Sequence, residues 1–95
     1  FKPALKSNIL LKKKEKLMEA LEEKIKEIMT DILEIDDEEI TDEFGPDNAD
    51  TWDSLNNLKM ITALEEEFEI TLTMDQIDSM INFSEIKKVI SNHTN

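Results

Sequence analysis

The apolar residues of the chain follow a helical period in several separate stretches. Between residues 14 and 33 they are separated by four, four, three, one and three positions, which places them on one face of a helix. This stripe consists of Leu17, Leu21, Ile25, Ile28, Met29 and Ile32. Charged residues fill the opposite face, so the pattern predicts a first amphipathic helix over residues 14–33. Ile9-Leu10-Leu11 either extend this helix or belong to a loose arm.

Residues 36–52 predict a long loop. Gly45-Pro46 interrupts any regular element there, and the surrounding Asp, Asn and Thr residues favour turns. We expect Ile40 and Phe44 to anchor this loop in the core. A connection of this length in a small domain usually has a function.

Three further helices follow the loop. Asp53 is a good N-cap for a second helix that ends near Phe68. Thr73 with Gln76 forms a capping-box signature for a short third helix. The same spacing recurs at Asn82, and it predicts a last helix that ends at about Ile90.

The pattern therefore predicts an all-α fold, a four-helix bundle with a long loop between the first two helices and a short third helix. Its expected core is formed by Leu21, Ile25, Ile28, Leu58, Ile61, Leu64, Phe68, Met80 and Ile86. The five methionines are expected to fill this core. Residues 1–16 form a basic N-terminal extension, disordered or continuing the first helix, residues 17–91 form the domain, and residues 92–95 form a flexible tail.

The charge is divided unevenly along the chain. Residues 1–16 contain six lysines and one acidic residue, whereas residues 17–95 contain five lysines and twenty-two acidic residues. An acidic body repels nucleic acid, whose phosphates require clustered cations, and it is attracted to basic surfaces on partner proteins. We expect a monomer that binds such surfaces and does not bind nucleic acid.

The inventory of reactive side chains excludes most enzyme classes. The chain has no Cys, Tyr or Arg, and its one histidine, His93, lies in the polar tail. We therefore expect neither an enzyme nor a metal site. The acidic residues between Asp31 and Glu43 lack the spacing of a calcium loop and are interpreted as a solvated surface.

The hydropathy of the chain and the residues at its start indicate where in the cell the protein is found. No stretch is long and apolar enough for a membrane span, and the basic start lacks the apolar segment of a secretory signal. We expect a cytoplasmic location. Because the chain begins without methionine, we also expect it to be processed, excised from a longer protein or joined to extra residues.

One set of residues is specific. Asp53-Ser54-Leu55 is followed by Leu58 and, nine residues after the serine, by the stretch A-L-E-E-E-F of residues 63–68. Over residues 17–91 this arrangement resembles the acyl carrier protein family. The resemblance implies a four-helix bundle in which Ser54, at the start of the second helix, carries phosphopantetheine. A helix N-terminus is a favourable place for the phosphate of that group.

The same resemblance implies the function and the partners. The protein would hold acyl groups as thioesters on the arm and pass them among enzymes of fatty acid, lipid or secondary metabolite biosynthesis. Its partners would be a phosphopantetheinyl transferase and acyl-loading and acyl-transferring enzymes with basic docking surfaces. Asp53, Leu55 and Glu66 are the predicted recognition residues. A cargo chain would lie between the second and third helices, near Ile61, Leu64, Phe68, Ile70 and Met80.

Several positions depart from the family pattern. Thr51 stands where many members have glycine, and it is followed by Trp52. Asn56, Asn57 and Lys59 occupy exposed positions of the second helix that are often acidic in the family. These differences favour a specialised pathway and partners that differ from the usual ones.

Two alternatives remain open at this point. A peptidyl or aminoacyl carrier would share the fold and the arm but hold amino acids. An acidic helical adaptor would carry no prosthetic group, and Ser54 would then be an ordinary helix-start residue, because serine favours that position.

Overall fold

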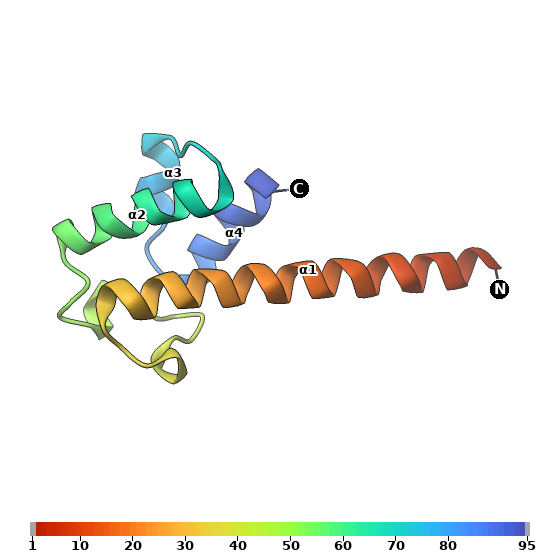
Figure 1. The fold of residues 1–95 in the computed structure, drawn as a ribbon, viewed down its shortest axis with the longest axis horizontal. Coiled ribbons are helices and arrows are strands. Elements are labelled where there is room, and N and C mark those ends of the chain that lie inside the picture. Colours follow the sequence, from red (N-terminus) through yellow and green to blue (C-terminus); the bar gives the residue numbers. More distant parts are fainter. Residues whose placement is uncertain (1, 95) are drawn as a thin grey trace.

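The computed structural model describes residues 2–94, with the side chains of Lys13 and of residues 15–94. Phe1 of the predicted extension and Asn95 of the predicted tail lie outside the described residues. The described part contains four α-helices, namely α1 (Lys2–Leu33), α2 (Ser54–Phe68), α3 (Met74–Ser79) and α4 (Phe83–Thr94). Two short 3-10 turns, η1 (Asp37–Glu39) and η2 (Pro46–Asn48), lie in the connection between α1 and α2. Residues 2–94 contain no strand, so the predicted all-α class with a long first loop is confirmed (Figure 1).

The first helix extends well beyond its predicted start. It spans 32 residues, about 48 Å at 1.5 Å per residue, which accounts for most of the 52 Å long axis of the molecule. Figure 1 shows that its N-terminal part projects past the other helices, while α2 runs back antiparallel to its C-terminal half. Residues 2–16 are therefore helical and continuous with the rest of α1.

In the described chain, each helix is too short or too polar to cross a membrane.

The core combines one face of each long helix. Its buried residues are Leu21, Ile25, Met29 and Leu33 from α1, Met60, Ile61 and Leu64 from α2, and Phe83, Ile86, Val89 and Ile90 from α4. Leu72 and Met80, from the segments around α3, complete it together with residues of the first loop.

Four residues predicted in the core or on the apolar stripe of the first helix are exposed instead. Leu58 is 63% exposed, because the rotation of α2 turns Met60 inward in its place. Leu17 is 70% exposed, because it lies at the edge of the bundle, where it lines an open hollow with Phe68 and Ser91. Of the five methionines, Met18 and Met74 are also exposed. Met29, Met60 and Met80 are buried, as the sequence predicts.

The loop before α2 is anchored as predicted. Ile40 and Phe44 are buried, and the Phe83 backbone N–H donates to the carbonyl oxygen of Phe44 at 2.9 Å. Gly45 passes so close to the connection between α3 and α4 that a Cβ atom there would lie 2.8 Å from the carbonyl oxygen of Ile81. Only glycine fits this approach without displacing backbone.

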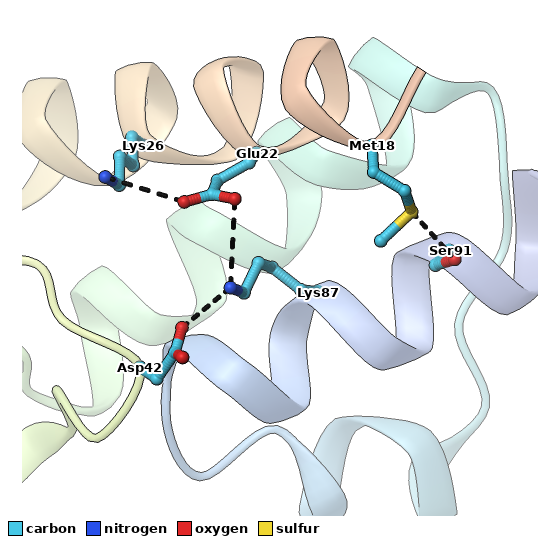
Figure 2. Close-up of polar contacts among 6 residues, drawn as sticks. All are labelled: Met18, Glu22, Lys26, Asp42, Lys87 and Ser91. Atoms are coloured by element: carbon cyan, nitrogen blue, oxygen red, sulfur yellow. Dashed lines mark hydrogen bonds and ion pairs between the residues drawn. The ribbon is translucent and has the colours of Figure 1, made fainter. Parts of the chain in front are cut away.

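A chain of ion pairs joins the same loop to α4 and α1, as Figure 2 shows. The ammonium group of Lys87 lies 2.7 Å from Asp42 and 3.9 Å from Glu22, and Lys26 lies 3.7 Å from Glu22. The Lys87 ammonium also lies 4.7 Å from the centre of the Phe83 ring, within reach of a cation–π interaction. The hydrogen bond from Lys87, helped by the attraction of its charge, lowers the pKa of Asp42.

The helix boundaries follow local capping bonds, with one exception. Gln76 N–H donates to Thr73 at 3.2 Å, and Glu85 N–H donates to Asn82 at 2.9 Å, which confirms both predicted N-caps. α4, however, continues past Ile90 to Thr94. Tertiary contacts support this extra turn, because the Ser91 hydroxyl donates to the sulfur of Met18 at 3.5 Å (Figure 2). Residues 92–94 of the predicted tail are therefore helical.

Candidate functional site

The candidate site lies at the N-terminus of α2, where the long loop ends. Ser54 is the first residue of the helix and is exposed. Asp53 is its N-cap, as predicted, and the Asn56 backbone N–H donates to the Asp53 carboxylate at 2.8 Å. The cap fixes the direction in which the helix starts and leaves the Ser54 hydroxyl at the surface.

The residues that depart from the family pattern contact one another across the start of α2. Trp52 is buried and stacks on Phe44, with ring centroids 5.8 Å apart. Its indole N–H donates to Oδ1 of Asn57 at 3.0 Å. One position earlier in α2, Nδ2 of Asn56 donates to the carbonyl oxygen of Thr51 at 2.7 Å. The two asparagines therefore tie the end of the loop to the first turn of α2.

Sequence reasoning noted these residues only as departures and missed the contacts between them. A pairing of residues five positions apart, across a helix start, leaves no periodic signal. Two successive asparagines in a first turn, where Asn favours hydrogen bonds to nearby backbone, are the one hint that the sequence contains.

A hollow of about 370 Å³ opens beside Ser54, between the start of α2 and α3. It is lined by Pro46, Trp52, Asp53, Ser54, Asn57, Ile77, Asp78, Met80 and Ile81. Of the five residues predicted near a cargo chain, only Met80 belongs to this lining. Ile61 and Leu64 are buried in the core, and Phe68 lines a separate hollow of about 360 Å³ near Leu17 and Ser91.

The outer face of α2 carries two large apolar side chains. Leu55 is 62% exposed and is therefore not a core residue. With Leu58, Lys59, Thr62, Ala63 and Glu66 it lines a shallow surface hollow. Leu55 and Glu66, two of the predicted recognition residues, therefore lie on one surface, whereas Asp53 lies beside Ser54.

The three successive glutamates of α2 have different surroundings. Glu65 accepts a hydrogen bond from the backbone N–H of Leu72 at 2.9 Å, so it fastens the chain after α2. Glu67 lies 3.4 Å from the ammonium group of Lys24 on α1. Glu66 is exposed. The carboxylate of Glu65 is therefore engaged within the fold, whereas the side chain of Glu66 lies at the surface.

The dense acidic stretch that runs from the last turn of α1 toward η2 is exposed. Asp31, Glu34, Asp36, Asp37, Glu38, Glu39, Asp42 and Glu43 all lie at the surface. Among the residues described, no three carboxylates or histidines gather in an arrangement that would hold a metal ion.

Comparisons with known proteins bear on the family of the chain. The chain is 33% identical over 72 residues to polyketide-8 synthase acyl carrier protein 1 of Streptomyces avermitilis, and the match covers 76% of this chain and 86% of the relative. No family model matches the chain. The helical fold and the place of Asp53-Ser54-Leu55 at the start of α2 are those that the resemblance to the family implies. The protein therefore belongs to the acyl carrier protein family and is a carrier rather than an enzyme.

Proposed function

We propose that Ser54 carries a phosphopantetheine arm, and that the protein holds acyl intermediates as thioesters on this arm and passes them among biosynthetic enzymes. The observation that supports this most directly is the exposed hydroxyl at the first residue of α2 in a member of a carrier family. The name of the relative assigns it to a polyketide synthase. This favours a secondary metabolite pathway over general fatty acid synthesis.

The surroundings of Ser54 fit a phosphodiester. The backbone N–H groups of Ser54 and Leu55 have no hydrogen-bond partner among the described residues, and a helix N-terminus carries a partial positive charge. The Asp53 carboxylate is engaged by the Asn56 N–H. A phosphate on Ser54 would therefore find free donors on its own helix.

Attachment is a group transfer that needs a separate transferase. The Ser54 hydroxyl oxygen attacks the phosphorus of coenzyme A that bears the pantetheine, a new P–O bond forms, and the pyrophosphate bond breaks. The leaving group is adenosine 3′,5′-bisphosphate, and the serine proton passes to a base on the transferase. The one histidine of the sequence, His93, contacts Gln76 on α3 at 3.0 Å.

The chain's own residues hold the serine in place and present it. The protein has no cysteine, and the bound group supplies the thiol on which an acyl chain is held as a thioester. Asp53 fixes the helix start, and the exposed Leu55 and Glu66 offer one surface to the transferase and to acyl-loading and acyl-transferring enzymes. The strongly acidic domain favours partners with basic surfaces.

Intact mass spectrometry tests this proposal. The parent protein, Ser54→Ala and the control Ser79→Ala are each incubated with coenzyme A and a broad-specificity phosphopantetheinyl transferase. Ser79 is an exposed serine at the end of α3. The parent and the control should gain the mass of one phosphopantetheine, and Ser54→Ala should gain nothing. A parent that is folded by circular dichroism but stays unmodified would refute the proposal, as would modification of Ser54→Ala.

A further inference from the structure

The hollow beside Ser54 contains a side-chain amide whose orientation is fixed. An indole N–H is only a donor, so the Asn57 atom that lies 3.0 Å from Trp52 Nε1 is the acceptor oxygen, Oδ1. The amide nitrogen, Nδ2, is then the other end of the group. Among the side chains and backbone groups that the structure describes, this nitrogen has no hydrogen-bond partner. Asn57 lines the hollow together with Ser54.

Trp52 fixes the orientation of the Asn57 side chain. Trp52 is only 5% exposed and stacks on the buried ring of Phe44, so the indole is fixed by packing. If the amide rotated, it would point a donor at the indole N–H and lose the hydrogen bond, which is worth about 1 kcal/mol. Asn57 therefore presents a donor in one orientation.

The position of Asn57 along α2 places it near anything attached to Ser54. The two residues are three positions apart, and side chains with this spacing are neighbours on one helix face, with Cβ atoms about 5–6 Å apart. A chain that leaves the Ser54 oxygen and enters the hollow therefore comes close to Asn57.

The composition of the hollow points to the chemistry of its occupant. Its volume of about 370 Å³ lies at the lower end of small-molecule sites, which span about 300–1,000 Å³. The amide of Asn57 and the carboxylate of Asp78 supply a donor and an acceptor, and Ile77, Met80 and Ile81 supply apolar walls. A plain alkyl chain would leave the amide unpaired, whereas a chain with carbonyl groups would satisfy it.

We infer that Asn57 is a binding residue whose Nδ2 group donates to a carbonyl oxygen on the chain attached to Ser54. The inference rests on the proposed function, because it requires a chain on Ser54. The carbonyl comes either from an amide of the phosphopantetheine arm or from a keto group of the cargo. Both sources present the same acceptor, and the experiment below separates them.

The experiment uses the full chain labelled with ¹⁵N, as the unmodified protein and in three modified forms. These carry the arm alone, a butanoyl arm or a 3-oxobutanoyl arm, and intact mass first establishes that each is complete. Failure at that step refutes the modification of Ser54 itself and is thereby distinguished from failure of the inference. The signals observed are the side-chain amide of Asn57 and the indole N–H of Trp52, which is unique because the chain has one tryptophan.

Asn57→Asp is the informative variant, because it keeps an acceptor for the Trp52 indole and removes the amide donor. Asn92→Asp makes the same chemical change on an exposed residue of α4 and is the matched control. We expect the Asn57 amide signals to shift on modification and to show nuclear Overhauser contacts to the arm or its cargo. In Asn57→Asp the contacts between the attached chain and Ile77 or Ile81 should be lost while the Trp52 indole stays bonded, and Asn92→Asp should behave as the parent.

The three modified forms identify the source of the carbonyl. An equal shift in all three assigns it to the arm, and a shift larger in the 3-oxobutanoyl form assigns it to the cargo. Either result supports the inference. Complete modification with Asn57 signals identical to those of the unmodified protein in all three forms overturns it. Retention of every contact to Ile77 and Ile81 in Asn57→Asp overturns it as well.

Discussion

The two faces of α2 carry similar residues and have opposite surroundings. The inner face buries Met60, Ile61 and Leu64. The outer face exposes Leu55 and Leu58, each by more than 60%. Hydrophobicity alone therefore does not tell which leucines stabilise the fold. Burial depends on which face of α2 packs against α1 and α4. The leucines on the opposite face remain available for contacts with other molecules.

Truncating one leucine on each face gives the largest expected contrast. Leu64 is 1% exposed, and Leu64→Ala should lower the free energy of unfolding by about 2–5 kcal/mol, because it removes apolar contacts and leaves a cavity. Leu58→Ala should change it by less than about 0.5 kcal/mol, since the side chain is at the surface. Urea unfolding followed by circular dichroism measures both. Equal losses would contradict the assignment of the two faces.

A second contrast lies within the run of glutamates. Glu65→Ala should lower the free energy of unfolding by about 1 kcal/mol or somewhat more, because the Leu72 N–H loses a charged acceptor. Glu66→Ala, on the exposed side, is the matched control and should have little effect. The same urea titration reports both values. If Glu66→Ala proved the more destabilising, Glu65 would not be the residue that fastens the chain after α2.

The outer face should affect recognition and leave stability unchanged. Leu55→Ala should reduce kcat/KM for modification by a phosphopantetheinyl transferase by about fivefold or more, as expected when an exposed apolar contact worth about 1 kcal/mol is removed at an interface. Its unfolding midpoint should equal that of the parent. The control is Met74→Ala, which truncates another exposed apolar residue, on α3. Equal losses of kcat/KM in the two variants would indicate that Leu55 has no special role.

The smallest effect concerns pH and the loop that precedes α2. Lys87 lowers the pKa of Asp42 from its ordinary value of 3.8, so the native state binds this proton less readily than the unfolded state. The contribution of the pair is fully present above that ordinary pKa and is lost as the pH falls through the lower, folded-state pKa. Asp42→Asn should therefore flatten the acid side of the stability profile.

The change should be small, because Asp42 is largely exposed and solvent screens the pair. Lys87→Gln removes the other partner and should flatten the profile in the same way. Urea unfolding at a series of pH values between neutral and strongly acidic measures both variants. A parent profile that matches both variants would show that the pair contributes nothing.

Much of the candidate site follows from local sequence. Asp53, Thr73 and Asn82 cap their helices through hydrogen bonds to N–H groups three residues away, and such short-range pairings are visible in the sequence. The position of Ser54 at the start of a helix follows from the same cap. The hollow beside it does not, because its walls come from α2 and α3 and meet only in the folded chain.

The sequence by itself determined the number of helices, most of their boundaries and the place of the serine, because capping and helical periodicity act over a few residues. The tertiary structure alone decided the rotation of α2, which exposes Leu58 and buries Met60. It also decided the bond between Trp52 and Asn57 and the left-handed backbone of Glu69 at the end of α2, with φ of 53°. Local propensity does not specify these features, since each depends on packing between segments that are separate in the sequence or on a backbone conformation that glutamate rarely adopts.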